Sequence, residues 1–193
     1  NDIDVNIDIL LFKNLIELEC MDYPYPINFD SLTNLIKLNC RNCKVSSINL
    51  PRLQILKCDD TEIKEVNHLT TLRKLICRNC DIENITLPYL KKLKSGMTNL
   101  RYIDAPNLEY LDCGECDNID FLRNLPKLRT FYYCHEQILT FIFDFDLPYL
   151  EILDINTDVN IDLLPSLKVV HARSLIGDLI SDPSSLIKLK IKK

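Results

Sequence analysis

Apolar residues recur along this chain with a period much longer than that of a helix or a strand. Short blocks open on a leucine and read L-x-x-L-x followed by a small or apolar residue, as in "LIKLNC" from Leu35 and "LRKLIC" from Leu72. Ten such blocks, spaced 17 to 22 residues apart, begin near Leu15, Leu35, Leu53, Leu72, Leu90, Leu108, Leu128, Leu150, Leu167 and Leu186. A repeat of roughly 20 residues predicts a stack of small units, each burying its apolar side against the next.

One segment imitates a block start inside another unit. "LRYIDA" from Leu100 would split the unit that opens at Leu90 into pieces of 10 and 8 residues. Eight residues extend over at most about 29 Å, which is too short for a full turn around a packed core. In the undivided unit Leu100 and Ile103 take positions 11 and 14, which are Ile82 and Ile85 in the unit before. We therefore expect one undivided unit.

This pattern resembles the leucine-rich repeat, whose signature is L-x-x-L-x-L-x-x-N/C-x-L. The fourth unit matches it at Leu72, Leu75, Cys77, Cys80 and Ile82, and the resemblance covers roughly residues 15–191. The short units look like those of bacterial effector proteins. The cysteine- and asparagine-rich composition is similar to arrays in giant DNA viruses of amoebae, which would make this a viral protein.

The resemblance implies an α/β-type repeat solenoid: a right-handed, strand-dominated superhelix with few helices. Each unit would place a short strand near positions 3 to 5, and the strands would stack into a parallel sheet on the concave side. Residues at positions 1, 4, 6, 11 and 14 would point into the coil. We expect a single domain over residues 1–193, in which residues 1–14 are a cap or a truncated unit.

Nine cysteines include three C-x-x-C pairs, which raise the question of a zinc site. A zinc ribbon has roughly 15–20 residues between its pairs, whereas 33 and 32 residues separate these. The pairs arise where positions 6 and 9 of one unit are both cysteine. A cysteine at position 6 fits a core, where free thiols behave as small apolar groups. At position 9 the repeat family implies an inward side chain that faces backbone carbonyls. We expect buried thiols, no metal and no cofactor.

Composition narrows the classes of function. The net charge of −5 gives no case for nucleic acid or a membrane surface as a partner. No apolar run reaches the roughly 18 residues that a membrane span requires. Because an odd number of cysteines would leave one thiol unpaired in a secreted protein, we expect an intracellular, cytoplasmic protein, with a host cytoplasm as one alternative.

Candidates for catalysis are few. The three histidines are His68, His135 and His171. His135 stands in "CHE", but a nucleophile and its base are brought together by the fold and not by adjacency in sequence. Three glycines leave no glycine-rich phosphate loop. We expect no enzymatic site in this chain.

Recognition of a protein partner is the function that we predict. Positions 3, 5 and 7 of each unit should face outward from the concave sheet, and they are basic in the first half and aromatic or acidic in the second. Tyrosine and arginine are frequent at binding hot spots, and opposed charges orient a partner. The predicted binding residues are Lys37, Arg41, Lys57, Lys74, Arg78, Lys92, Lys94, Tyr110, Asp112, Tyr132, Asp154 and His171.

Two other functions fit the same sequence. The array could be a structural element that self-associates, since complementary charge in its halves permits head-to-tail contacts. It could also be the targeting portion of a larger enzyme, such as a ubiquitin ligase, with the catalytic part outside these residues.

Overall fold

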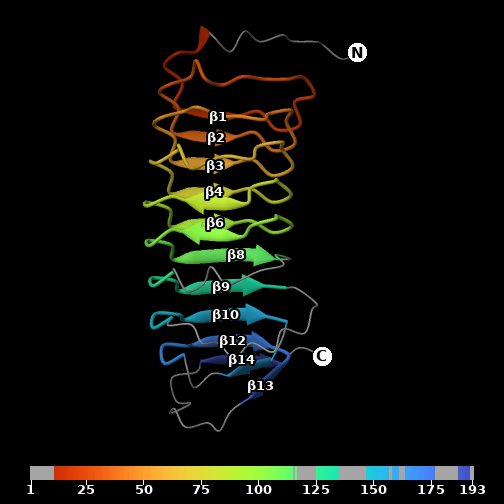
Figure 1. Ribbon diagram of the computed structural model, residues 1–193, viewed down its shortest axis with the longest axis vertical. Coiled ribbons are helices and arrows are strands. Elements are labelled where there is room, and N and C mark those ends of the chain that lie inside the picture. Colours follow the sequence, from red (N-terminus) through yellow and green to blue (C-terminus); the bar gives the residue numbers. More distant parts are fainter. Residues whose placement is uncertain are drawn as a thin grey trace.

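The computed structural model describes residues 11–114, 116, 125–134, 147–156, 158–160, 164–176 and 187–191, of which 158–160 and 174–176 are described by their backbone alone. These residues form a solenoid, in which each sequence unit is one coil of the stack (Figure 1). No α-helix occurs within them, and nothing in these ranges has the length and apolarity of a membrane-spanning helix. The prediction of a strand-dominated solenoid with a parallel sheet is confirmed.

The main sheet has ten parallel strands, and each begins at position 3 of its coil. In spatial order they are β1 (Glu17–Glu19), β2 (Lys37–Asn39), β3 (Ile55–Lys57), β4 (Lys74–Ile76), β6 (Lys92–Lys94), β8 (Tyr110–Gly114), β9 (Thr130–Tyr133), β10 (Ile152–Ile155), β12 (Val169–Ala172) and β14 (Lys188–Ile191). Neighbouring strands pair with position 3 opposite position 3, as Lys74 does with Lys92. Side chains at one position therefore form rows across the sheet.

Two short sheets lie outside the main one. β5 (Asn84–Thr86) pairs with β7 (Tyr102–Asp104), and β11 (Asp158–Asn160) pairs with β13 (Ser174–Ile176). The segment that follows Leu100 is β7, which contributes no strand to the main sheet. That placement fits one undivided coil from Leu90.

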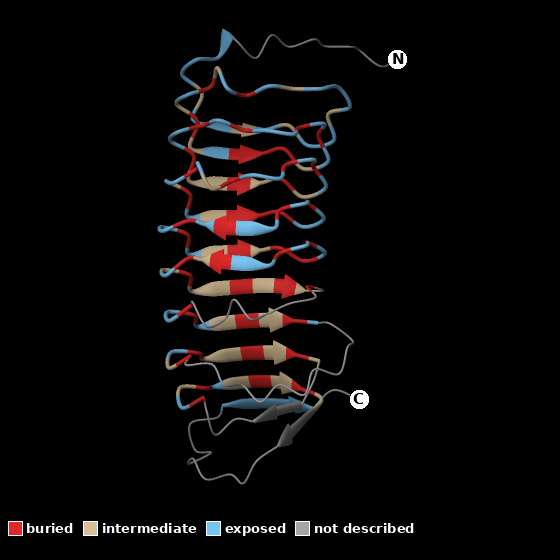
Figure 2. Ribbon diagram, viewed as in Figure 1, coloured by how far each residue is buried: buried red, intermediate tan, exposed pale blue. Residues whose placement is uncertain are grey.

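The core is a set of apolar columns that run through the stack. Position 4 is fully or almost fully buried in eight successive coils, at Leu38, Leu56, Leu75, Leu93, Leu111, Phe131, Leu153 and Val170. In the third coil, positions 1, 4, 6, 11 and 14 are all buried, as predicted: Leu53, Leu56, Cys58, Ile63 and Val66. Figure 2 shows the buried middle residue of each central strand. Burial of one such leucine or isoleucine contributes about 1.5–3 kcal/mol.

The chain turns at position 8 of the coil after each of the first five strands of the main sheet, which are β1, β2, β3, β4 and β6. The φ at position 8 is positive, between 53° and 60°, at Asp22, Asn42, Asp60, Asn79 and Met97. This left-handed conformation is tolerated by Asn and Asp and costs other side chains more. Asn42 Nδ2 donates to Asp22 Oδ1 at 2.8 Å, and Asn79 Nδ2 donates to Asp60 Oδ1 at 2.9 Å. The turn thus has its own polar row, in which Met97 is the exception.

Some predicted features lie outside the described residues. They are residues 1–10 of the predicted cap or truncated unit, His135 and the opening Leu186 of the last unit.

Candidate binding face

All twelve predicted binding residues lie on one surface, the sheet face, which is formed by the side chains at positions 3, 5 and 7 of the main sheet's coils. Alternate residues of a strand point to opposite sides, so position 4 enters the core while its neighbours face outward. In β4, Leu75 is fully buried and Lys74 is half-buried. Asn39 and Ile76, both at position 5, are nearly covered, at 5% and 7% exposure.

Carboxylates on β1 form ion pairs with two of the cations, and the pair to Lys57 is the longer one. Lys37 Nζ lies 3.0 Å from Glu17 Oε2, and Lys57 Nζ lies 4.0 Å from Glu19 Oε1. Neither glutamate is among the predicted binding residues, although both occupy outward positions, 3 and 5, of the first coil. The signal that identifies them is the repeat itself, because residues at the same position of adjacent coils lie side by side across the sheet.

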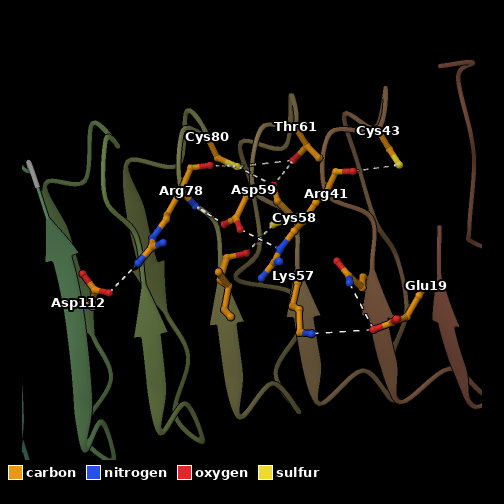
Figure 3. A network of polar contacts seen from close by, with 12 residues as sticks. Glu19, Arg41, Cys43, Lys57, Cys58, Asp59, Thr61, Arg78, Cys80 and Asp112 are labelled. Atoms are coloured by element: carbon orange, nitrogen blue, oxygen red, sulfur yellow. Dashed lines mark hydrogen bonds and ion pairs between the residues drawn. The ribbon is translucent and has the colours of Figure 1, made fainter. Parts of the chain in front are cut away.

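A second polar row follows position 7, just beyond the strands. Arg41 Nε lies 2.9 Å from Asp59 Oδ2, as an ion pair whose angle is not that of a hydrogen bond. The backbone N–H of Arg78 donates to Asp59 Oδ1 at 2.8 Å. Arg78 Nη2 and Lys94 Nζ then share Asp112 Oδ2, at 2.8 and 3.2 Å. Figure 3 shows Arg41, Asp59, Arg78 and Asp112 in this order along the sheet.

The contact between Arg78 and Asp112 skips a coil, since the two residues are 34 positions apart. Gly96 takes position 7 in the coil between them. A Cβ added to Gly96 would meet Arg78 Cγ at 4.0 Å and the Cα of Gly114 at 3.7 Å. Because Gly96 has no side chain, the guanidinium can cross its coil and reach the carboxylate beyond.

Aromatic rings border the cations on the C-terminal side. Lys92 Nζ lies 3.9 Å above the ring centroid of Tyr110, and Lys94 Nζ lies 5.4 Å from the same centroid. Both distances are typical of cation–π contacts. The Tyr110 and Tyr132 rings lie 5.5 Å apart. Burial, followed by the charges of Tyr110 and Asp154, raises the pKa of Tyr132.

Lys74 is the cation of the sheet face whose positive charge is least neutralised by its neighbours. No ion pair to it occurs among the described residues, and its pKa is lowered by burial and then by the charges of Lys92, Lys57, Lys94 and Arg41. A hollow of about 210 Å³ opens beside it on the sheet face. Its lining comprises Glu17, Leu18, Glu19, Lys37, Leu38, Asn39, Ile55, Lys57 and Lys74.

The described histidines have backbone or carboxylate partners. His171 Nδ1 lies 2.9 Å from Asp154 Oδ2, and this pair closes the sheet face beyond the tyrosines. His68 Nε2 lies 2.5 Å from the carbonyl oxygen of Ile48, away from the main sheet. His135 is outside the described residues.

Seven of the nine cysteines are buried, as predicted, whereas Cys20 is half-buried and Cys134 is exposed, which differs from the expectation of buried thiols. Cys43 Sγ donates to the carbonyl of Cys20 at 2.7 Å, and Cys80 Sγ donates to that of Cys58 at 3.0 Å. Threonine does the same at position 9, since Thr61 Oγ1 donates to Cys58 O at 2.8 Å. No disulfide joins the nine cysteines, and no group of three or more His, Cys, Asp or Glu in the described part of the chain is placed to hold a metal.

The thiols differ in acidity because their surroundings differ. Burial raises the pKa of Cys77 and of Cys113 well above the usual value. Cys80 is the reverse case: a hydrogen bond from the Cys58 side chain, aided by Thr61, lowers its pKa to about 7 against the effect of burial.

No protein-family model matches this chain, and no curated protein matches it in sequence. Solved structures do match. Internalin C2 from Listeria monocytogenes aligns with a TM-score of 0.61 and 20% identity, over 93% of this chain and 82% of that one. The fold is a leucine-rich-repeat solenoid. The functional domain of InlJ from Listeria monocytogenes, which includes a cysteine ladder, aligns with a TM-score of 0.55 and 18% identity. That match covers 96% of this chain and 55% of that one. At 18% and 20% identity, the two matches show a shared fold.

Proposed function

We propose that this protein is a non-enzymatic recognition module that binds another protein through its sheet face. One observation carries the proposal: a cluster of incompletely neutralised cations lies beside two neighbouring tyrosines, Tyr110 and Tyr132, on one continuous sheet. Such a surface offers charge for orientation and aromatic area for affinity. The same mode of binding would serve if the chain were the targeting portion of a larger enzyme. Intracellular action in the cytoplasm, a host's included, is part of the proposal, supported by nine cysteines without a disulfide. A viral source rests on the resemblance in composition alone.

A site-specific crosslinker tests the proposal. The photoreactive residue p-benzoylphenylalanine would replace Tyr132 on the sheet face, and in a matched control it would replace Tyr89. Tyr89 is 59% exposed and lies in the turn before β6, away from the sheet face. Both changes exchange one aromatic side chain for another, so neither alters charge.

Irradiation in a lysate of the source organism should crosslink a discrete second protein through position 132 and not through position 89. Equal products from both positions, or products from position 89 alone, would contradict the proposal. A product of twice the 22.5 kDa chain mass from position 132 would favour the self-assembly alternative.

A further inference from the structure

The charges on the sheet face indicate the chemistry of the partner segment that binds there. We propose that the occupant is an acidic segment of the partner protein, whose carboxylates lie over Lys57, Lys74 and Lys92. This inference rests on the proposed function and narrows it. The site is defined by strands β3, β4 and β6, with the hollow beside Lys74 at its centre.

The charges of the face do not balance. Strands β2, β3, β4 and β6 and their turns carry seven cations, and four carboxylates form ion pairs with five of them, so 7 − 4 leaves a net charge of +3. The cations are Lys37, Arg41, Lys57, Lys74, Arg78, Lys92 and Lys94, and the carboxylates are those of Glu17, Glu19, Asp59 and Asp112. Two cations share Asp112, and Lys92 has a tyrosine ring in place of an anion.

The excess charge lies in one place. Lys74 and Lys92 are directly opposed in the β4–β6 pair, and adjacent strands lie about 4.8 Å apart. Ile55, which is half-buried, lies opposite Lys74 on the other side, so the neighbour of Lys74 in β3 is apolar and carries no compensating charge. Burial first, and then the positive charges of Lys92, Lys57 and their neighbours, lower the pKa of Lys74. A carboxylate set over Lys74 would relieve that repulsion.

Acidic residues at both margins favour a peptide over a nucleic acid. Glu17 and Glu19 border the cluster on β1, while Asp112 and Asp154 border it on β8 and β10. A nucleic-acid strand laid across the sheet would meet these carboxylates, and the whole chain has a net charge of −5. Nucleic-acid binding uses about 6–10 phosphate contacts in typical cases, whereas the net excess here is +3.

Binding of a labelled peptide of six glutamates, followed by fluorescence anisotropy, tests the inference. Lys74→Met should weaken binding by about tenfold, which is the loss of one charge-assisted contact. Lys92→Met is a second variant with the same expectation. Lys64→Met is the matched control, because Lys64 is exposed, pairs with Asp81 at 3.7 Å and lies off the sheet face. It should bind as the unmodified protein does.

A second readout is independent of affinity. In a ¹⁵N-lysine NMR titration, the pKa of Lys74 should rise when the glutamate peptide binds, because the carboxylates favour its charged form. A peptide of six glutamines should leave the pKa unchanged.

Three results would overturn the inference. They are equal affinity of the unmodified protein and Lys74→Met, tighter binding of a lysine peptide, and preferential binding of oligo-dT with a steep salt dependence. The first two leave crosslinking through position 132 untouched, so the acidic-segment inference can fail while the proposed function stands. Loss of crosslinking would instead count against the proposed function.

Discussion

The left-handed residue of the fifth turn offers a stabilising substitution. Met97 has a φ of 57° at a position where the preceding coils have Asp or Asn. A side chain in this conformation costs about 1–2 kcal/mol, and Asn adopts it more readily than Met. Because Met97 is 63% exposed, its replacement removes little buried apolar area. Met97→Asn should therefore stabilise the protein by about 1 kcal/mol.

Thermal unfolding followed by circular dichroism measures this change. For a chain of this length, 1 kcal/mol corresponds to a rise in Tm of roughly 2–4 °C. The chain's other methionine supplies the control. Met21 is 48% exposed, sits one position earlier in its own turn and does not have a positive φ, so Met21→Asn should shift stability by less than about 0.5 kcal/mol. If Met97→Asn gains no more than Met21→Asn, the strain assigned to position 8 is wrong.

Three further predictions concern Asp112, Gly114 and Cys80. Asp112→Asn removes a carboxylate that two cations share, and should destabilise the protein by about 0.5–1 kcal/mol in urea unfolding; a loss that does not shrink in concentrated NaCl would argue against an ionic cause. Gly114→Ala places a Cβ 3.2 Å from the Cα of Gly96 at a φ of +40°, and should cost about 1–3 kcal/mol in thermal unfolding, where an unchanged Tm would refute the close approach. The hydrogen bond from Cys58 lowers the pKa of Cys80 to about 7 in the fold, against an ordinary value of 9.0, so between pH 7 and 9 the unfolded thiol holds a proton that the folded one has released. The stability that Cys80 contributes is thus present above pH 9 and is lost as the pH falls through 7. Unfolding in urea should show this slope, and Cys80→Ser should remove it; an unaltered slope would mean that another group titrates.

The leucine spacing was enough to predict the phase of the solenoid. Each coil repeats the same inward set, so one residue such as Leu75 determines where its strand starts and which side chains face outward. The cysteines followed from the same columns: Cys77 is at a buried position, and Cys80 turns to a carbonyl of the neighbouring coil, as the repeat implies. A repeat makes such predictions possible because every unit meets nearly the same neighbours.

The ionic pattern of the sheet face could not be predicted in this way. The sequence predicts that the first half of the sheet face is basic. In the structure, Glu17 and Glu19 of the first coil form ion pairs with two of its lysines and reduce that positive charge. The contact from Arg78 to Asp112 depends on a long side chain passing over Gly96, a feature of three coils together. The repeat pattern gives the outward residues of each coil separately, whereas the side chains on a sheet pair with partners across two or more strands.

Backbone NMR of the protein with the glutamate peptide tests the central claim most directly. Recognition through the sheet face predicts shifted amide signals in β3, β4 and β6, with β5 and β7 unaffected. Shifts concentrated in β5 and β7, while the main sheet stays unchanged, would place binding on another surface and contradict the account.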